Sequence, residues 1–168
     1  MSGVPLIVTA LFGHEDFAFF NDLRGRYYPL DHNHVQAHVT MLSHLPPSVA
    51  DELKRRLNAE TRGVPAPAAR LAGVMDLNDG VALRIESHGL ETIRDRIAQA
   101  FAPLLIPHDR AGWVPHVTLQ NNVPRQVALA AKAELRASIV PRAVKIAGLA
   151  SWWYRGGPWE AHSRHMFA

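Results

Sequence analysis

Hydrophobic residues recur along the chain with two periods, one typical of short strands and the other of amphipathic helices. The apolar, β-branched run at 5–12 predicts a buried strand. A helix is predicted at 17–27, with Asp16 as its N-cap. A carboxylate oxygen at this position can accept hydrogen bonds from the free backbone N–H groups of the first turn. A second helix is predicted at 48–60, where apolar residues are spaced four apart. The first third of the chain therefore contains a predicted strand and two predicted helices.

A hairpin sequence lies in the middle of the chain. Two strand-like runs, 70–77 and 81–86, are separated by Asn78-Asp79-Gly80, and Asp-Gly favours a tight turn between antiparallel strands. Two helices and two closing strands are predicted beyond it, at 90–101, 124–138, 143–154 and 158–167. Each half of the chain thus contains a helix, a short strand, a second helix and a hairpin.

The short strand of each half carries the same triplet, His38-Val39-Thr40 in the first and His116-Val117-Thr118 in the second. The apolar runs around them, 35–42 and 113–119, predict strands. Because side chains alternate along a strand, His and Thr of a triplet point to one face and Val to the other. If the two strands lie side by side, two imidazoles and two hydroxyls meet at one site.

The repeat predicts an α+β fold, a bilobal pseudo-symmetric duplication in which antiparallel sheets flank a central cleft and helices pack on the outer faces. Each lobe would give one motif strand to the cleft. We expect residues 1–168 to form a single two-lobed domain, since the length lies in the one-domain range and 48% hydrophobic residues can build a core.

Composition narrows the classes of function. The chain has no cysteine, which excludes a disulfide framework, a thiolate nucleophile and a cysteine zinc site. No apolar stretch reaches the roughly 18 residues of a membrane helix, and the N-terminal residues lack the pattern of a signal peptide. A net charge of +3 suits an anionic ligand without requiring nucleic acid. We expect a cytoplasmic protein without membrane association that acts as a monomer.

The motifs His38-Val39-Thr40-Met41 and His116-Val117-Thr118-Leu119 resemble the signature of the 2H phosphoesterase superfamily, two His-x-Thr/Ser-hydrophobic motifs in a bilobal α+β fold. The chain is most similar to the bacterial group named after 2′-5′ RNA ligase, which includes cyclic nucleotide phosphodiesterases. Pro115 before the second motif is typical of that group, while Met41 stands where Leu is commoner. The resemblance implies hydrolysis, or reversible ligation, of a cyclic or 2′-5′ phosphodiester.

The same four side chains suit this chemistry. Two histidines near neutral pKa can act as base and acid, one neutral and one protonated. The hydroxyls of Thr40 and Thr118 can donate to the non-bridging phosphoryl oxygens. The resemblance implies these roles for His38, Thr40, His116 and Thr118, with either histidine as the base and with no metal or other cofactor. The expected substrate is an RNA end or a small nucleotide with a cyclic or 2′-5′ phosphate.

Six further residues are weaker candidates for substrate binding. Four aromatic side chains could stack a base or simply pack in the core: Tyr28, Trp113, Trp152 and Tyr154. Two arginines could pair with a phosphate or remain solvated: Arg84 and Arg155.

Two other functions fit the same residues. One is a non-catalytic RNA-binding or nucleotide-binding module with the same fold. The other is a metal-dependent hydrolase built on His32, His34 and His38, although this loop lacks the carboxylate and helix context of known zinc motifs, which favours solvated histidines. Activity that survives a chelator would distinguish the metal-independent phosphoesterase from the metal-dependent hydrolase.

Overall fold

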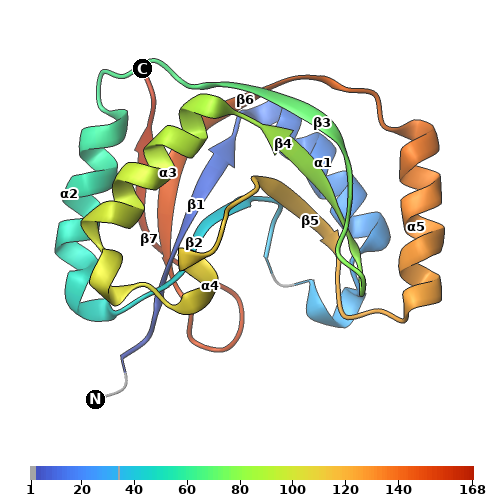
Figure 1. Cartoon of the computed structure of the whole chain (residues 1–168), viewed down its shortest axis with the longest axis horizontal. Coiled ribbons are helices and arrows are strands. Elements are labelled where there is room, and N and C mark those ends of the chain that lie inside the picture. The colour runs from blue at the N-terminus through green and yellow to red at the C-terminus, as the bar shows by residue number, and fades with distance from the viewer. Residues whose placement is uncertain (1–2, 34) are drawn as a thin grey trace.

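A seven-stranded sheet runs through the computed structural model, which describes residues 3–33 and 35–168, apart from the side chain of His32. All of its strand pairs are antiparallel, and the strand order is β2-β1-β6-β3-β4-β5, with β7 paired to β6 (Figure 1). In chain order the elements are β1 (Leu6–Phe12), α1 (His14–Tyr27), η1 (Leu30–His32), β2 (Val39–Leu45), η2 (Pro47–Val49), α2 (Ala50–Thr61), β3 (Ala68–Asp76), β4 (Val81–Glu86), α3 (His88–Ala100), η3 (Ala102–Leu104), α4 (Pro107–Arg110), β5 (His116–Gln120), α5 (Arg125–Ser138), β6 (Arg142–Trp153) and β7 (Glu160–Met166).

The strand order confirms the predicted duplication. Exchanging β1 with β4, β2 with β5 and β3 with β6 leaves the path unchanged, so a pseudo-twofold axis passes between β3 and β6. The repeating unit differs from the predicted one, because the central hairpin is divided: β3 closes the first half and β4 opens the second. Strand β7 stands outside the repeat.

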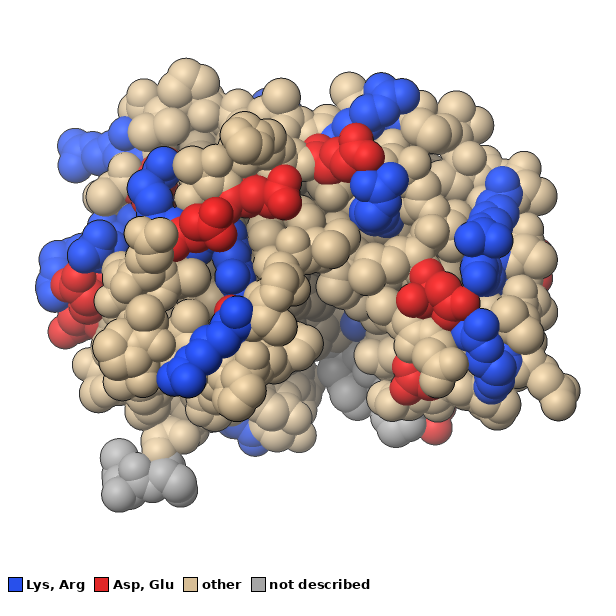
Figure 2. Space-filling view, viewed as in Figure 1, with Lys and Arg blue, Asp and Glu red and all other residues tan. Residues whose placement is uncertain are grey.

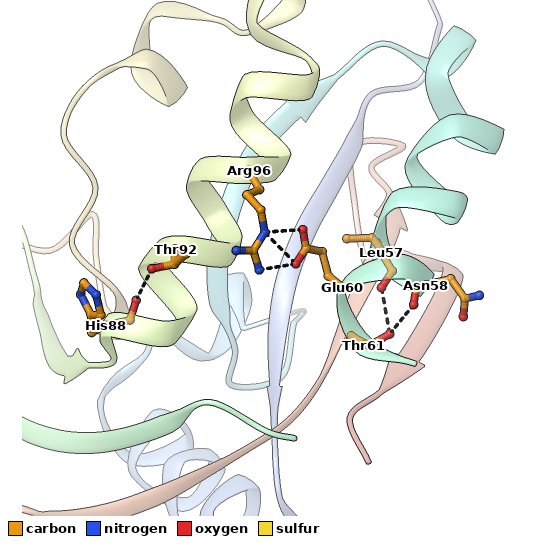
Figure 3. A network of polar contacts seen from close by, with 7 residues as sticks. All are labelled: Leu57, Asn58, Glu60, Thr61, His88, Thr92 and Arg96. Carbon is orange, nitrogen blue, oxygen red and sulfur yellow. Dashed lines mark hydrogen bonds and ion pairs between the residues drawn. The ribbon is translucent and has the colours of Figure 1, made fainter. Parts of the chain in front are cut away.

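Helices cover the outer sides of the two lobes, and each lobe combines helices from both halves of the chain. In Figure 1, α2 and α3 lie together on the left, and α1 and α5 lie on the right. Figure 3 shows Arg96 of α3 paired with Glu60 of α2 at 2.6 Å. On the other side, the Tyr27 hydroxyl of α1 donates to Glu134 of α5 at 3.2 Å. Both contacts are exposed and contribute at most about 1 kcal/mol each. They show which helices are neighbours but add little to the stability of the helix pairs.

Burial explains the sequence pattern. All seven residues of β1 are buried, because this strand lies between β2 and β6 and both of its faces are covered. A strand covered on both faces gives a continuous apolar run rather than an alternating one. On α2, Leu53 and Leu57 are completely buried, which confirms the predicted helix face.

Helix α1 begins earlier than predicted. It starts at His14, so Asp16 lies inside the first turn. The Asp16 carboxylate accepts the Lys145 N–H at 2.7 Å and pairs with Arg142 at 2.7 Å. A tertiary contact with β6 therefore takes the side chain that was predicted to cap the helix. Among the helices of the described residues, none is long and apolar enough to cross a bilayer.

The central hairpin generates a stability prediction. Gly80 packs so tightly against the backbone of Gln120 and Asn121 that a Cβ would overlap them, whereas a Cβ at Gly73 would meet nothing within 4 Å. We expect Gly80→Ala to lower the free energy of unfolding by about 1–3 kcal/mol, the usual cost of overpacking. The control, Gly73→Ala, should be close to neutral. Denaturant unfolding of both variants measures the difference, and equal stabilities would contradict the tight approach of the hairpin to β5.

Candidate active site

The two motif strands end the sheet path at opposite edges, yet they meet in the middle of the molecule. β2 and β5 are in contact there without forming a backbone ladder (Figure 1). The free edge of a strand normally exposes a row of unpaired N–H and C=O groups. In this protein, side chains from the opposite half of the chain satisfy several of these groups.

Carbonyl groups on the two edges accept from three large side chains. From the first half, Arg24 Nη1 donates to the Thr118 carbonyl at 2.7 Å. From the second half, Trp113 Nε1 donates to the Thr40 carbonyl at 3.0 Å, and Arg94 Nε donates to the next carbonyl of β2 at 3.1 Å. Each motif strand is therefore held by the half of the chain to which it does not belong.

The N–H groups of β2 are held by a buried carboxylate. Asp109 of α4 accepts the Ser43 N–H at 3.0 Å, the Ser43 hydroxyl at 2.9 Å and the His44 N–H at 3.2 Å. This aspartate is 3% exposed. Charge-assisted hydrogen bonds of this kind are stronger than neutral ones, so Asp109 fixes the position of β2 along the cleft.

The two motif histidines are oriented in the same way. Nδ1 of His38 lies 2.7 Å from the Gln36 carbonyl, and Nδ1 of His116 lies 2.8 Å from the Val114 carbonyl, in each case two residues earlier. A carbonyl only accepts, so Nδ1 carries the hydrogen in both rings. In each neutral imidazole Nε2 is then free to accept a proton, and in each imidazolium it can donate one.

The environment of His38 keeps its imidazole neutral. Burial lowers its pKa to about 4; the Gln36 carbonyl opposes this shift, and the positive charges of Arg24 and His116 add to it. The Trp159 ring lies against the imidazole, with 4.7 Å between ring centroids. The strand that begins at His116, β5, is in contact with β2, which begins directly after His38.

Both motif threonines line the cavity of His38, and Thr40 also lines that of His116. Thr40 and Thr118 line a cavity of about 360 Å³, together with Arg24, Tyr28, Val35, His38, Asn121, Tyr154, Gly156, Gly157 and Trp159. A second cavity, of about 410 Å³, shares Thr40 and contains His116. The cleft therefore runs from His38 past Thr40 to His116. Figure 2 shows the surface hollowed between the lobes, and on this face basic and acidic side chains of the described residues are interspersed.

The predicted motif strands begin later than the sequence indicates, at Val39 and His116 rather than at 35 and 113. Backbone groups before the first motif bond to side chains instead of a ladder. The Ala37 N–H donates to Asn21 Oδ1 at 2.7 Å, and the Gln36 carbonyl accepts from the His38 ring. These contacts place His38 just before β2.

The four aromatic candidates all line cavities of the cleft. Tyr28 and Tyr154 line the cavity of His38, and Trp113 lines that of His116. Trp152 lines a third cavity, of about 330 Å³, which also contacts His38. Its Nε1 donates to the buried Thr9 hydroxyl at 2.9 Å, which fixes the ring.

The two arginine candidates lie outside these cavities. Arg84 faces His116 across the β4–β5 ladder, but its guanidinium pairs with Glu86 at 2.7 Å. Arg155 pairs with Glu160 at 2.8 Å. Their role in phosphate binding stays a prediction.

Sequence reasoning missed two residues of the cleft, Arg24 and Trp159. Arg24 lies in the last turn of α1, outside any motif. Trp159 lies in the loop between β6 and β7, far from His38 in sequence. The Gly156-Gly157 turn in this loop was the nearest signal, but its packing against a cavity of the cleft is visible only in the fold.

Within the described residues, no group of three or more His, Cys, Asp or Glu side chains is arranged to hold a metal ion. The predicted alternative of His32, His34 and His38 includes His34 and the side chain of His32, which lie outside the described residues.

Asp109 generates a prediction about the cleft. Asp109→Asn places an NH₂ group or a neutral oxygen opposite the N–H groups of β2, so we expect a loss of about 1–3 kcal/mol in unfolding free energy. Asp95→Asn, on an exposed position of α3, is the matched control and should be nearly neutral. Urea unfolding of both variants tests this expectation. An Asp109→Asn protein as stable as the control would show that the carboxylate does not hold β2.

Comparison with known proteins identifies one family and several solved structures of similar fold. A family model described as the 2′-5′ RNA ligase superfamily matches residues 13–158. No curated protein sequence matches the chain. Among solved structures, TT0787 of Thermus thermophilus superposes with a TM-score of 0.69 at 16% identity, covering 97% of both chains.

The structures of E. coli LigT are similar as well. The complex with 3′-AMP has a TM-score of 0.61 at 15% identity, and the complex with NADP+ has 0.59 at 17%, each covering 98% of both chains. At such identities these neighbours establish the fold, and they confirm the bilobal α+β architecture.

Proposed function

Because the chain belongs to the 2′-5′ RNA ligase superfamily of 2H phosphoesterases, we propose that it hydrolyses a 2′,3′-cyclic phosphate or a 2′-5′ phosphodiester of RNA or a nucleotide without a metal. The observation that carries this proposal is the matched orientation of two imidazoles in a cleft lined by Thr40 and Thr118. In each, Nδ1 bonds to a carbonyl, and Nε2 makes no hydrogen bond to the described residues. His38, Thr40, His116 and Thr118 are the proposed catalytic residues.

The reaction with a cyclic phosphate uses both histidines in one step. His38, which is neutral, accepts a proton from water as the water oxygen attacks phosphorus. The bond from phosphorus to one ribose oxygen breaks, and protonated His116 gives that oxygen its proton. The hydroxyls of Thr40 and Thr118 donate to the non-bridging oxygens while charge builds on them. In the ligating direction the two histidines exchange roles.

The substrate class follows from the cleft. Tyr154 lines the cavity of the proposed phosphate position, and Trp113 lines the cavity on the His116 side. Tyr28 also lines the first cavity, with the Arg24 guanidinium over its ring. Aromatic faces stack unpaired bases, which favours an RNA end or a small nucleotide. The 3′-AMP and NADP+ complexes of LigT support this class.

We further propose that residues 1–168 work as a single domain and as a monomer. Both histidines come from one chain, and the hydrogen bonds of Arg24, Trp113 and Arg94 join the lobes at the site itself. One lobe alone would lack half of the catalytic groups.

A non-catalytic nucleotide-binding module of the same fold is the second candidate. It is favoured by the aromatic lining alone, whereas the matched histidines favour the enzyme. A panel of 2′,3′-cyclic nucleotides and 2′-5′ dinucleotides, followed by product analysis, separates them: the enzyme gives phosphomonoesters, and the module binds without turnover.

Histidine replacement tests whether both motif histidines take part in the catalytic step. We expect His38→Ala and His116→Ala each to lower kcat/KM by at least about a hundredfold, the low end for a lost acid or base. The double variant should lose much less than the product of the two effects, because one loss already disables the step. His44→Ala, on an exposed position of β2, is the control and should retain full activity. Chelator should leave the wild-type rate unchanged; a rate abolished by chelator would favour the metal-dependent alternative.

The lowered pKa of His38 predicts the acidic limb of the pH profile. A base must be neutral, and His38 is neutral above a pKa of about 4. We therefore expect kcat/KM to stay high down to about pH 5 and to fall only as the pH passes through about 4, whereas an ordinary histidine would give a limb near 6.5. Both limbs report macroscopic values of the pair. An acidic limb near 6.5 would contradict the role of His38 as the base.

A further inference from the structure

Arg24 is a buried cation without an anionic partner. It is 5% exposed, and among the described residues no carboxylate lies within ion-pair distance of it. Burial lowers the pKa of its guanidinium, although arginine stays protonated at neutral pH. A buried charge is costly unless it is compensated, so this position needs an explanation.

The guanidinium is fixed on three sides. Nε donates to Asn33 Oδ1 at 3.0 Å, Nη1 donates to the Thr118 carbonyl at 2.7 Å, and the Tyr28 ring lies 3.9 Å from the guanidinium carbon. Nη2 makes no hydrogen bond within the described part of the chain, and it is not sealed from solvent. The donor that remains free therefore belongs to a group that is already oriented.

The free donor belongs to a side chain that lines the cavity of His38, Thr40 and Thr118. Of the described residues that line this cavity, none is Asp or Glu. A fixed guanidinium beside two hydroxyls, without a carboxylate, is an arrangement that binds phosphoryl oxygens.

Arg94 provides the contrast. It is also buried, at 7% exposed, and it also donates to a carbonyl of a motif strand. Burial lowers the pKa of its guanidinium as well, but the nearby Asp109 and Asp95 carboxylates oppose this shift, and its Nη2 donates to the Asp109 carbonyl at 2.6 Å. An arginine can therefore hold a strand edge while nearby carboxylates favour its charge, as Arg94 does. Holding the edge of β5 does not explain why Arg24 lacks such carboxylates among the described residues.

We propose that Arg24 is the phosphate-binding cation of this site, with Nη2 donating to a non-bridging oxygen of the substrate while Nη1 holds Thr118. This rests on the function proposed above and extends it, since Arg24 joins the four motif side chains as a group that touches substrate. The site would favour ligands with an exposed anionic phosphoryl group.

Phosphate binding tests the proposal without turnover. We expect Arg24→Met to weaken the binding of inorganic phosphate at pH 7 by at least about tenfold, as for a lost charge-assisted hydrogen bond. Arg26→Met, which removes an exposed arginine from the same last turn of α1, is the matched control and should leave the Kd unchanged. Calorimetry gives the Kd, and thermal unfolding shows that each variant is folded. An unchanged Kd in folded Arg24→Met, an equal loss in both variants, or no phosphate binding by the wild type would overturn the proposal.

One further readout keeps the test decisive if the methionine variant does not fold. In the wild type with ¹⁵N-labelled arginine, phosphate should shift the Nε–H resonance of Arg24 and leave that of Arg94 in place, the assignments coming from Arg24→Lys and Arg94→Lys. No shift at saturating phosphate would overturn the proposal.

The two proposals fail separately. A wild type that binds phosphate through Arg24 but hydrolyses no cyclic or 2′-5′ phosphodiester would refute the proposed function alone. Turnover that is unaffected in Arg24→Met would refute the role of Arg24 alone.

Discussion

The structure depends on hydrogen bonds from side chains to the free edges of the two motif strands. β2 and β5 do not pair with each other, and a closed ladder between them would leave no cleft. Arg24, Trp113, Arg94 and Asp109 satisfy the edge groups instead, each acting on the strand of the other half. This solution keeps the strands close and their edges satisfied, while space remains between the histidines.

Much of the fold could be predicted from the sequence because its signals are local. The period of α2, the Asp-Gly turn of the central hairpin and the repeated triplet each depend on a few adjacent residues, and all three predicted the observed elements. The starts of β2 and α1 could not be predicted. They depend on Asn21 taking the Ala37 N–H and on Asp16 reaching β6, which are tertiary contacts without a local signal.

The same distinction applies to the site. The triplets predicted that the two motif strands lie close together, and in the fold β2 and β5 are in contact. Arg24 and Trp159 could not be found from the sequence. Nothing in the residues around a helical arginine or a loop tryptophan indicates that its side chain reaches the cleft. Arg84 and Arg155 were candidates for phosphate binding from the sequence, but in the fold each pairs with a nearby glutamate.

The segment that leads into β7 adds an asymmetry to a site built from two repeated halves. In a protein made of two identical halves, the two imidazoles would have equal affinities for a proton, and neither would be the preferred acceptor. The loop before β7 has no counterpart in the first half, and it brings Trp159 against His38. The one strand outside the duplication thus leads to an aromatic contact with one histidine of the pair, so the two motif histidines lie in different surroundings.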